Sequence, residues 1–305
     1  MNNRLSRRRL LQAGALALGG TLLPPLVRAQ AASANIATAE LGGAFLFQGA
    51  GCNVVALRGD DGALLIDGGL AANADALLRA VFAATGNDRI HTLINTHWHR
   101  DHVGANELVG RAGGTIFAHE KTRQYLSHRV YSWPAGEALE PLPEIAVPTE
   151  TARGDGSLEL AGQKVGYGYL PAAHTDGDLF VHFAALNVLV AGGVVSGERW
   201  PPIDYRNGAW FGGRVRALER LADLVAADTR VVPAHGRLIT GRDIVRQRDI
   251  YQELFLTLIG YMNMGLGAED VVALNPLERY EGELGDASEF LDSAFRSMQI
   301  AYVPD

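Results

Sequence analysis

The sequence Thr96-His97-Trp98-His99-Arg100-Asp101-His102 places four candidate metal ligands within six consecutive positions. Three are imidazoles, whose ordinary pKa of about 6.5 leaves them mostly neutral at pH 7 and able to bind a cation, and the fourth is a carboxylate. Protonated imidazoles packed so closely would repel one another. The cluster therefore predicts a bound metal ion.

The residues on either side of the cluster predict that it lies on a loop. Residues 90–95 are a short β-branched and apolar run that favours a strand, and residues 104–110 favour a helix. On a helix, His97 and His99 would point to nearly opposite sides, because residues two apart do not share a face. On an extended loop they can converge on one ion, while Asp101 and His102 reach a neighbouring position.

Composition and charge narrow the class of protein. The 305 residues are 48% hydrophobic with a net charge of −7, which indicates a globular chain with a sizeable core and excludes nucleic acid as its main partner. Cys52 is the only cysteine, so no intrachain disulfide can form. It lies in an apolar run, where we interpret it as a small buried side chain rather than a metal ligand or nucleophile.

The N-terminus resembles an export signal. The residues Ser6-Arg7-Arg8-Arg9-Leu10-Leu11-Gln12 match the twin-arginine pattern, and an apolar run follows over residues 13–23. A membrane anchor is the alternative, but the run is shorter than the roughly 20 residues that span a bilayer. We therefore predict a signal peptide over residues 1–31, cleaved after Ala29 or Ala31, and a periplasmic or secreted protein without a stable membrane anchor.

The mature chain reads as one domain, residues 32–305, with two series of strands and helices and a helical tail from about residue 240. Two further histidines stand where predicted strands end: His174 in a polar turn, and His235 after Arg230-Val-Val-Pro-Ala. The predicted strands cover residues 44–48, 53–57, 63–67, 115–119, 157–160, 163–170, 178–183, 187–191 and 230–233, and the predicted helices cover residues 71–85, 120–128, 211–226, 243–261, 268–274 and 287–302.

Other polar residues allow more than one interpretation. Asp67 ends a strand, where its carboxylate could either bond to a metal-binding histidine or cap the following helix. Residues 130–150 are rich in Pro and Glu and are predicted to form a long loop bordering the site. The remaining histidines of the mature chain are interpreted as structural: His91, His119, His128 and His182.

The motifs His97-x-His99-x-Asp101-His102, His174 and Pro-Ala-His235-Gly resemble those of the metallo-β-lactamase superfamily, in the same order. The resemblance implies an α/β fold, the four-layer αβ/βα sandwich of the metallo-β-lactamase type, here with a helical C-terminal appendage. It also implies two zinc ions at one edge of the facing sheets. By that resemblance His97, His99 and His174 hold the first zinc, and Asp101, His102 and His235 hold the second.

Gly193 departs from the family pattern. Most hydrolases of the superfamily place a metal-bridging Asp after a glycine that follows a strand, whereas here Gly192 is followed by Gly193. Lactamases of the third subclass also lack a ligand there and still bind two zincs. We therefore expect a second zinc that is held more weakly, and expect Gly193→Asp to raise its occupancy.

The resemblance implies a zinc-dependent hydrolase. Zinc-bound hydroxide, oriented by Asp101 as the catalytic residue, would attack a carbonyl and cleave an ester, lactone, thioester or β-lactam bond in a small-molecule substrate. An iron-dependent dioxygenase is a lesser alternative, because an all-nitrogen first site favours zinc.

A second alternative comes from a different class of protein. The export signal, Trp200-Pro-Pro-Ile-Asp204 and the helical tail are similar to exported metallohydrolases that accompany quinoprotein or thiosulfate-oxidation systems. The chain could therefore be a non-hydrolytic accessory or cofactor- and metal-binding protein with a protein partner in a periplasmic oxidation pathway.

Overall fold

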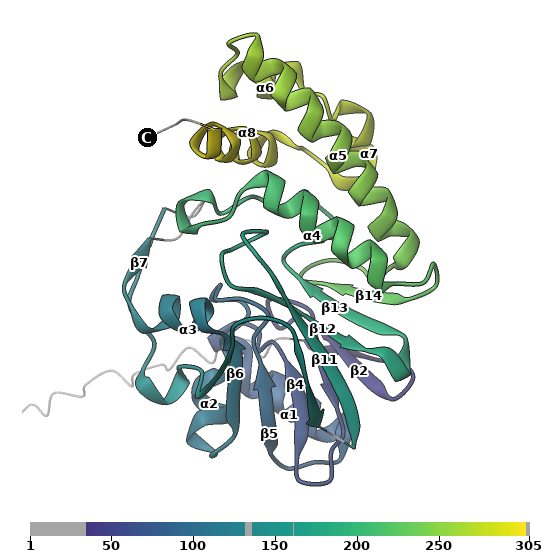
Figure 1. Cartoon of the computed structure of the whole chain (residues 1–305). Coiled ribbons are helices and arrows are strands. Elements are labelled where there is room, and N and C mark those ends of the chain that lie inside the picture. Colours follow the sequence, from purple (N-terminus) through teal and green to yellow (C-terminus); the bar gives the residue numbers. More distant parts are fainter. Residues whose placement is uncertain (1–34, 132–135, 161, 303–305) are drawn as a thin grey trace, which may run out of the picture. The chain divides into compact units, whose positions relative to one another are not determined.

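The computed structural model describes residues 35–131, 136–160 and 162–302. The predicted signal peptide, residues 1–31, lies outside these ranges. Two β-sheets face each other, and helices cover the outer face of each (Figure 1). Within the described part of the chain, no helix combines the length and the apolar character that crossing a bilayer requires.

The first sheet has seven strands in the order β1-β2-β3-β4-β5-β6-β9. β1 to β4 form an antiparallel meander, and β5, β6 and β9 then add in parallel. The strands are β1 (Ala37–Glu40), β2 (Ala44–Gln48), β3 (Val54–Leu57), β4 (Ala63–Ile66), β5 (Ile90–Ile94), β6 (Thr115–His119) and β9 (Glu150–Ala152).

The second sheet has six strands in the order β10-β11-β12-β13-β14-β15, and all neighbours are antiparallel except β13 and β14. A separate hairpin joins β7 (Val130–Tyr131) to β8 (Ala138–Leu139). The strands of the sheet are β10 (Gly156–Leu160), β11 (Gln163–Leu170), β12 (Asp178–Phe183), β13 (Val188–Gly192), β14 (Arg230–Pro233) and β15 (Ile239–Thr240).

Three apolar cores separate four layers, which confirms the predicted αβ/βα sandwich. Between the sheets, Leu46 and Ile66 share a core with Val190. Val81 belongs to a core between the first sheet and its helices, and Leu218 to one between the second sheet and its helices. Strands that are apolar on both faces are expected where a sheet is covered on both sides. The helices are α1 (Ala74–Thr85), α2 (Asn106–Arg111), α3 (Glu120–Ser127) and α4 (Phe211–Leu224).

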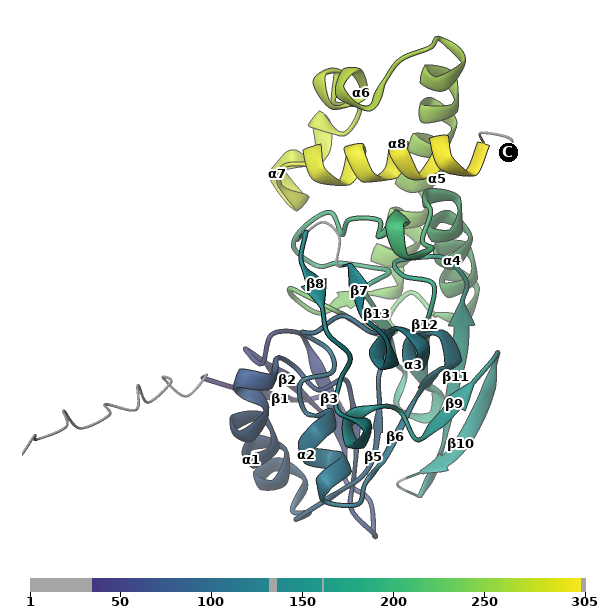
Figure 2. The same ribbon diagram turned by 90° about the vertical axis from the view of Figure 1, so that its left-hand side faces the viewer.

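The predicted helical tail is present and packs as part of the same domain. Helix α5 (Gly241–Asn263) lies along α4, and α8 (Ser288–Tyr302) lies above α4 and crosses α5 part-way along its length (Figure 2). Between them are α6 (Ala268–Leu274) and α7 (Glu281–Leu284). Leu254 and Phe290 from the tail share one buried core with Leu218 of α4, so the tail is part of the second helical layer.

Several predicted boundaries were wrong, for local reasons. β1 lies in a segment without a predicted strand, because its four residues are all exposed and carry no apolar alternation. Residues 130–150, predicted to be one long loop, contain the β7–β8 hairpin. Residues 71–73 form a 3-10 helix rather than the first turn of α1. α2 starts at Asn106 rather than at residue 104. Gly104 lies outside the helix, packed so closely on another segment that a Cβ would be 2.2 Å from the backbone nitrogen of Ala71.

The strand register brings the candidate ligands to one edge of the sandwich. β4 and β5 are parallel with Ile66 opposite Ile94, so Asp67 and the 96–102 segment leave the sheet side by side. In the second sheet Gly192 pairs with Pro233, which places Gly193 near the segment that carries His235. A hydrogen bond of 2.7 Å from Leu179 N to Thr96 O ties the two sheets together at this edge.

Candidate metal centre

The first group of candidate ligands is His97, His99 and His174, called here the first triad. One ring nitrogen from each lies within 4.8 Å of the others. His99 Nδ1 is 3.1 Å from His174 Nε2, and the rings of His97 and His99 meet edge to face with centroids 4.8 Å apart. The loop thus lets His97 and His99 converge, and His174 reaches them from the other sheet.

Each histidine of the first triad has a second partner on its outer nitrogen. His97 Nδ1 lies 3.0 Å from Thr96 Oγ1, and His99 Nε2 lies 3.4 Å from the buried carboxylate of Asp204. His174 Nδ1 lies 3.2 Å from the carbonyl oxygen of Pro202. Such outer contacts fix the orientation and tautomer of a metal-binding imidazole.

Arg214 lies behind His174 and is fully buried. Its guanidinium donates to the carbonyl oxygens of Ala173, Val194 and Pro202, and its Nη2 is 3.2 Å from His174 Nδ1. Backbone carbonyls therefore satisfy a buried cation. The arrangement fixes the wall from which His174 projects.

The second group is Asp101, His102 and His235, called here the second triad, and its ligand atoms also lie within 4.8 Å of one another. Asp101 Oδ2 is 3.1 Å from His235 Nε2 and 3.7 Å from His102 Nε2. Asp101 and His235 are 29% and 25% exposed, whereas His102 is buried. The structure thus brings together all six residues that the family resemblance assigned to the metals.

Asp67 connects the two triads. Its carboxylate accepts hydrogen bonds from the backbone nitrogen and the hydroxyl of Thr96, both at 2.8 Å, and its Oδ2 lies 2.9 Å from His102 Nδ1. Of the two interpretations of Asp67, the structure supports the bond to a candidate metal ligand. Its backbone has a φ of 63°, an uncommon conformation outside glycine that turns the chain at the end of β4.

Two buried nitrogens test whether a metal fits. In the described part of the chain, Nε2 of His97 and Nε2 of His102 are both buried and have no hydrogen-bond partner. Unsatisfied buried polar atoms are costly and uncommon. One belongs to each triad, and a cation bound by each triad would give both atoms a partner. The donor sets, three imidazoles and two imidazoles with a carboxylate, suit zinc.

The electrostatics differ between the triads. Burial, reinforced by neighbouring histidines, lowers the pKa of His97 and of His174 well below the ordinary value. Burial also disfavours the charged form of His102, but Cys52, Asp67 and Asp101 outweigh it, so its pKa is raised. Burial opposes ionisation of Asp101, yet His102 and His235 hold its pKa below the usual range.

Gly193 offers no metal ligand, and it also leaves the space that the ring of His174 occupies. A Cβ placed on it would lie 2.1 Å from Cδ2 and 2.5 Å from Nε2 of His174. Any side chain at this position would therefore displace His174. The structure overturns our expectation that Gly193→Asp would raise occupancy of the second site, since the new side chain would first disturb the first triad.

The structure also places the remaining histidines and the single cysteine of the sequence. The ring of His119 stacks on Tyr169, and none of the four histidines interpreted as structural belongs to a group of candidate ligands in the described residues. Cys52 is buried, as predicted, but its sulfur lies within 4.8 Å of ligand atoms of Asp67 and His102, and burial raises its pKa. The sequence did not show this proximity.

A cavity of about 460 Å³ opens beside the triads. His99, Asp101, His174 and His235 line it together with Leu139 from β8. The segment predicted to border the site therefore does so through the β7–β8 hairpin. Glu289 of α8 also lines the cavity, so the helical tail contributes to the candidate site.

Comparisons with known proteins agree with this architecture. The family model of the metallo-beta-lactamase superfamily matches residues 48–236, more than half of the chain. The chain belongs to the metallo-beta-lactamase superfamily. Members are mostly hydrolases, and the fold typically binds zinc. The match ends at Gly236, before the tail helices begin.

Solved structures of this fold share little sequence with the chain. A metallo-beta-lactamase from Pontibacter korlensis is 18% identical with a TM-score of 0.58, over 71% of this chain and 99% of its own. A stereoselective inverting sec-alkylsulfatase from Pseudomonas sp. is 19% identical with a TM-score of 0.61, over 86% of this chain and 49% of its own. A comparison with curated proteins found no match. These likenesses show the fold.

Sequence reasoning missed several residues that support the triads. Asp204 was quoted only as part of a motif, although a carboxylate after Trp-Pro-Pro-Ile can turn inward. Arg214 occupies the buried face of α4 with Phe211 and Leu218, three residues before it and four after it. An arginine on an otherwise apolar helix face is a signal of a buried cation. Thr96 carried no signal of its own.

Proposed function

We propose that the protein is a zinc-dependent hydrolase that cleaves an ester, lactone, thioester or β-lactam bond. The main support is the pair of buried Nε2 atoms of His97 and His102 that lack a hydrogen-bond partner, one in each triad. Other members of both triads line a single cavity. Zinc held by the two triads would supply Lewis acidity, which makes a water molecule more acidic and polarises a carbonyl oxygen.

Asp101 is the proposed catalytic residue among the protein's own groups. It lines the cavity, is 29% exposed, and has its pKa held low, so at neutral pH it is a carboxylate. As such, it can orient the attacking water by accepting a hydrogen bond from it. The water oxygen bonds to the carbonyl carbon, the bond to the leaving oxygen, sulfur or nitrogen breaks, and the proton passes to that leaving atom.

His99 and His174 have mainly a holding role. Asp204 fixes the ring of His99, and the Pro202 carbonyl and Arg214 fix the ring of His174. Neither ring can turn without losing these contacts. The first triad is therefore preorganised, which limits reorganisation during the reaction.

Assays on zinc-loaded mature protein test this proposal. A chromogenic cephalosporin, an aryl ester, an aryl thioester and a homoserine lactone represent the four bond types, and His99→Ala is the matched control. Turnover of at least one substrate well above the control is expected. Turnover no higher than the control on all four would contradict a hydrolase and favour an accessory protein, the alternative that the absent bridging side chain at Gly193 supports.

We also propose twin-arginine export to the periplasm or the medium, on the strength of residues 6–12. The mass of protein recovered from the periplasm would test it, because cleavage after Ala29 or Ala31 predicts two defined mature masses. A protein partner in a periplasmic oxidation system is proposed together with the alternative of an accessory protein.

A further inference from the structure

The apolar walls of the catalytic cavity come from three segments far apart in the chain. Leu70 follows β4, Leu139 belongs to β8, and Trp200-Pro201-Pro202 lies between β13 and α4. Single exposed apolar residues are ordinary. Three apolar segments around one cavity beside candidate metal ligands are a concave apolar surface of the kind that binds small molecules.

Leu70 is held in place by its backbone rather than by burial. It is 41% exposed, yet its nitrogen donates to the carbonyl of Ala50 at 2.8 Å. A Cβ on Gly104 would come within 2.2 Å of its carbonyl carbon, so the two backbones touch. The side chain therefore stays at the cavity, where it gains little from the protein core. A ligand that covers it would remove apolar surface from water.

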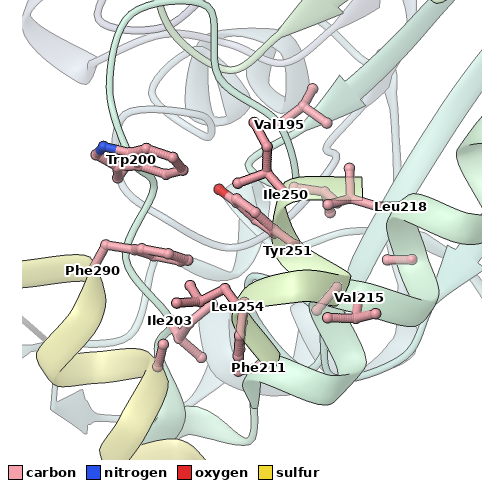
Figure 3. Close-up of a cluster of buried hydrophobic side chains, with 14 of the residues drawn as sticks. Val195, Trp200, Ile203, Phe211, Val215, Leu218, Ile250, Tyr251, Leu254 and Phe290 are labelled. Carbon is pink, nitrogen blue, oxygen red and sulfur yellow. The ribbon is translucent and has the colours of Figure 1, made fainter. Parts of the chain in front are cut away.

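The Trp200-Pro201-Pro202 segment of the cavity lining packs on the helical tail. Trp200 stacks on Phe290 of α8, with ring centroids 5.5 Å apart, and its Nε1 donates to the carbonyl of Gly285 at 3.2 Å. Tyr251 of α5 stacks against both Trp200 and Phe290 (Figure 3). This packing keeps the wall rigid and apolar, so a polar substituent placed against it would lose its water without gaining partners.

Charged residues of both signs line the cavity, and the acidic ones are more numerous. The basic residues are Arg100 and Arg199, and the acidic residues are Asp101, Glu137, Asp204 and Glu289. An anionic acyl group gains no net attraction from this set, so the binding energy of an acyl group should come mainly from apolar contact. In the proposed hydrolysis the leaving atom gains negative charge, which a cation held by the triads would stabilise. The group that remains on the carbonyl carbon is left for the apolar walls.

We infer that the site takes esters or thioesters with an apolar acyl group, an inference that rests on the proposed function. Leu70 and Leu139 line the cavity and would contact the acyl chain. Short polar acyl groups would leave these side chains uncovered. Burying each further methylene is expected to raise affinity by up to about fourfold.

Ligand binding tests the inference without any catalysis. Calorimetry on metal-free protein with acetamide, butanamide and octanamide measures the apolar contact with an uncharged probe. Octanamide should bind at least tenfold more tightly than butanamide, and Leu70→Asn should remove most of that difference. Leu139→Asn is a second variant if Leu70→Asn does not fold. Leu256→Asn, at a 70% exposed leucine of α5 outside this cavity, should leave the ratio unchanged.

Hydrolysis provides the second measurement. On zinc-loaded protein, kcat/KM for p-nitrophenyl esters should rise at least tenfold from acetate to octanoate, and the rise should shrink in Leu70→Asn. Equal affinity for all three amides, or equal kcat/KM along a series that is hydrolysed, would overturn the inference. If none of the four bond types is hydrolysed while octanamide still binds preferentially, the hydrolase proposal fails and the apolar site stands.

Discussion

The two triads share one cavity but differ in how firmly their residues are held. In the first, His97, His99 and His174 each have a partner on the outer nitrogen, and His97 is only 1% exposed. In the second, only His102 has such a partner, Asp67. Among the described residues, Asp101 and His235 pair only within their own triad. Both triads offer three candidate ligands, but the ligands of the first triad have more hydrogen-bond partners outside the triad than those of the second.

This difference separates two roles within one metal centre. A braced, buried triad binds its ion tightly because its ligands need no reorganisation. A triad with two partly exposed members is expected to exchange its ion more readily. A substrate in the cavity would meet both triads, since His99 and His174 line the cavity as well as Asp101 and His235. We therefore expect dialysed protein to hold nearer one metal per chain than two. Asp67, bonded to both Thr96 and His102, is the one carboxylate on which both triads depend.

Removing one ligand from either triad, in two separate variants, should have the largest effect on metal content and activity. His174→Ala should abolish the first metal and, with it, most activity, because it deletes a ligand and leaves Arg214 without its neighbour. His235→Ala should leave one metal bound, since the first triad remains complete. Elemental analysis of dialysed protein gives the metal per chain, and loss of both metals in His235→Ala would show that the triads are not independent.

A side chain at Gly193 is a subtler way to weaken the first triad alone. Gly193→Ala brings a Cβ against the ring of His174, which must then leave its contacts with Pro202 and Arg214. We expect first-site affinity to fall by about 10- to 100-fold, the cost typical of disturbing outer contacts of a metal ligand. Competition with a chromophoric chelator measures this affinity.

Gly260→Ala is the matched control for that change. Gly260 lies on α5, where a Cβ would meet nothing within 4 Å, and alanine favours a helix. Its metal affinity should equal that of the unmodified protein. An unchanged first-site affinity in Gly193→Ala would mean that the loop carrying His174 can shift at little cost.

How far the sequence could reveal this centre depended on where its residues act. His97, His99, Asp101 and His102 act through local spacing on one loop, so the sequence alone indicated a metal there. The register of the strands then placed His174 and His235 beside them, which the family resemblance anticipated. The strand and helix patterns predicted most of the separate elements, and the family resemblance implied the layered sandwich that they form.

The supporting residues could not be read in this way, because each acts through contacts between distant segments. Asp204 meets His99 across 105 positions, and Arg214 meets His174 across 40. Compared with the family pattern, Gly193 indicated only a missing metal ligand. Its short distance to His174 shows that the histidine ring occupies the space that a side chain there would need. β1 was missed for a different reason: it is paired through its backbone and has no buried side chain.

Acidification should weaken metal binding at the second triad at a higher pH than at the first, a smaller effect than those of the variants above. Without metal, the raised pKa of His102 means that it carries a proton at neutral pH, so a metal entering the second triad must displace that proton. His97 and His174 have lowered pKa values and stay neutral until the solution is well below pH 6.5. Protons therefore compete for the second triad at a higher pH than for the first.

The expected result follows from the sign of these shifts. As the pH falls below the raised pKa of His102 at fixed free zinc, second-site affinity should drop by about tenfold per pH unit, because one proton competes with the metal, while first-site affinity stays nearly constant until lower pH. Metal content measured against pH should show two separate losses, and circular dichroism of metal-free protein checks that the fold persists. A single loss, with both metals leaving at one pH, would mean that the outer contacts of the first triad give it no advantage over the second.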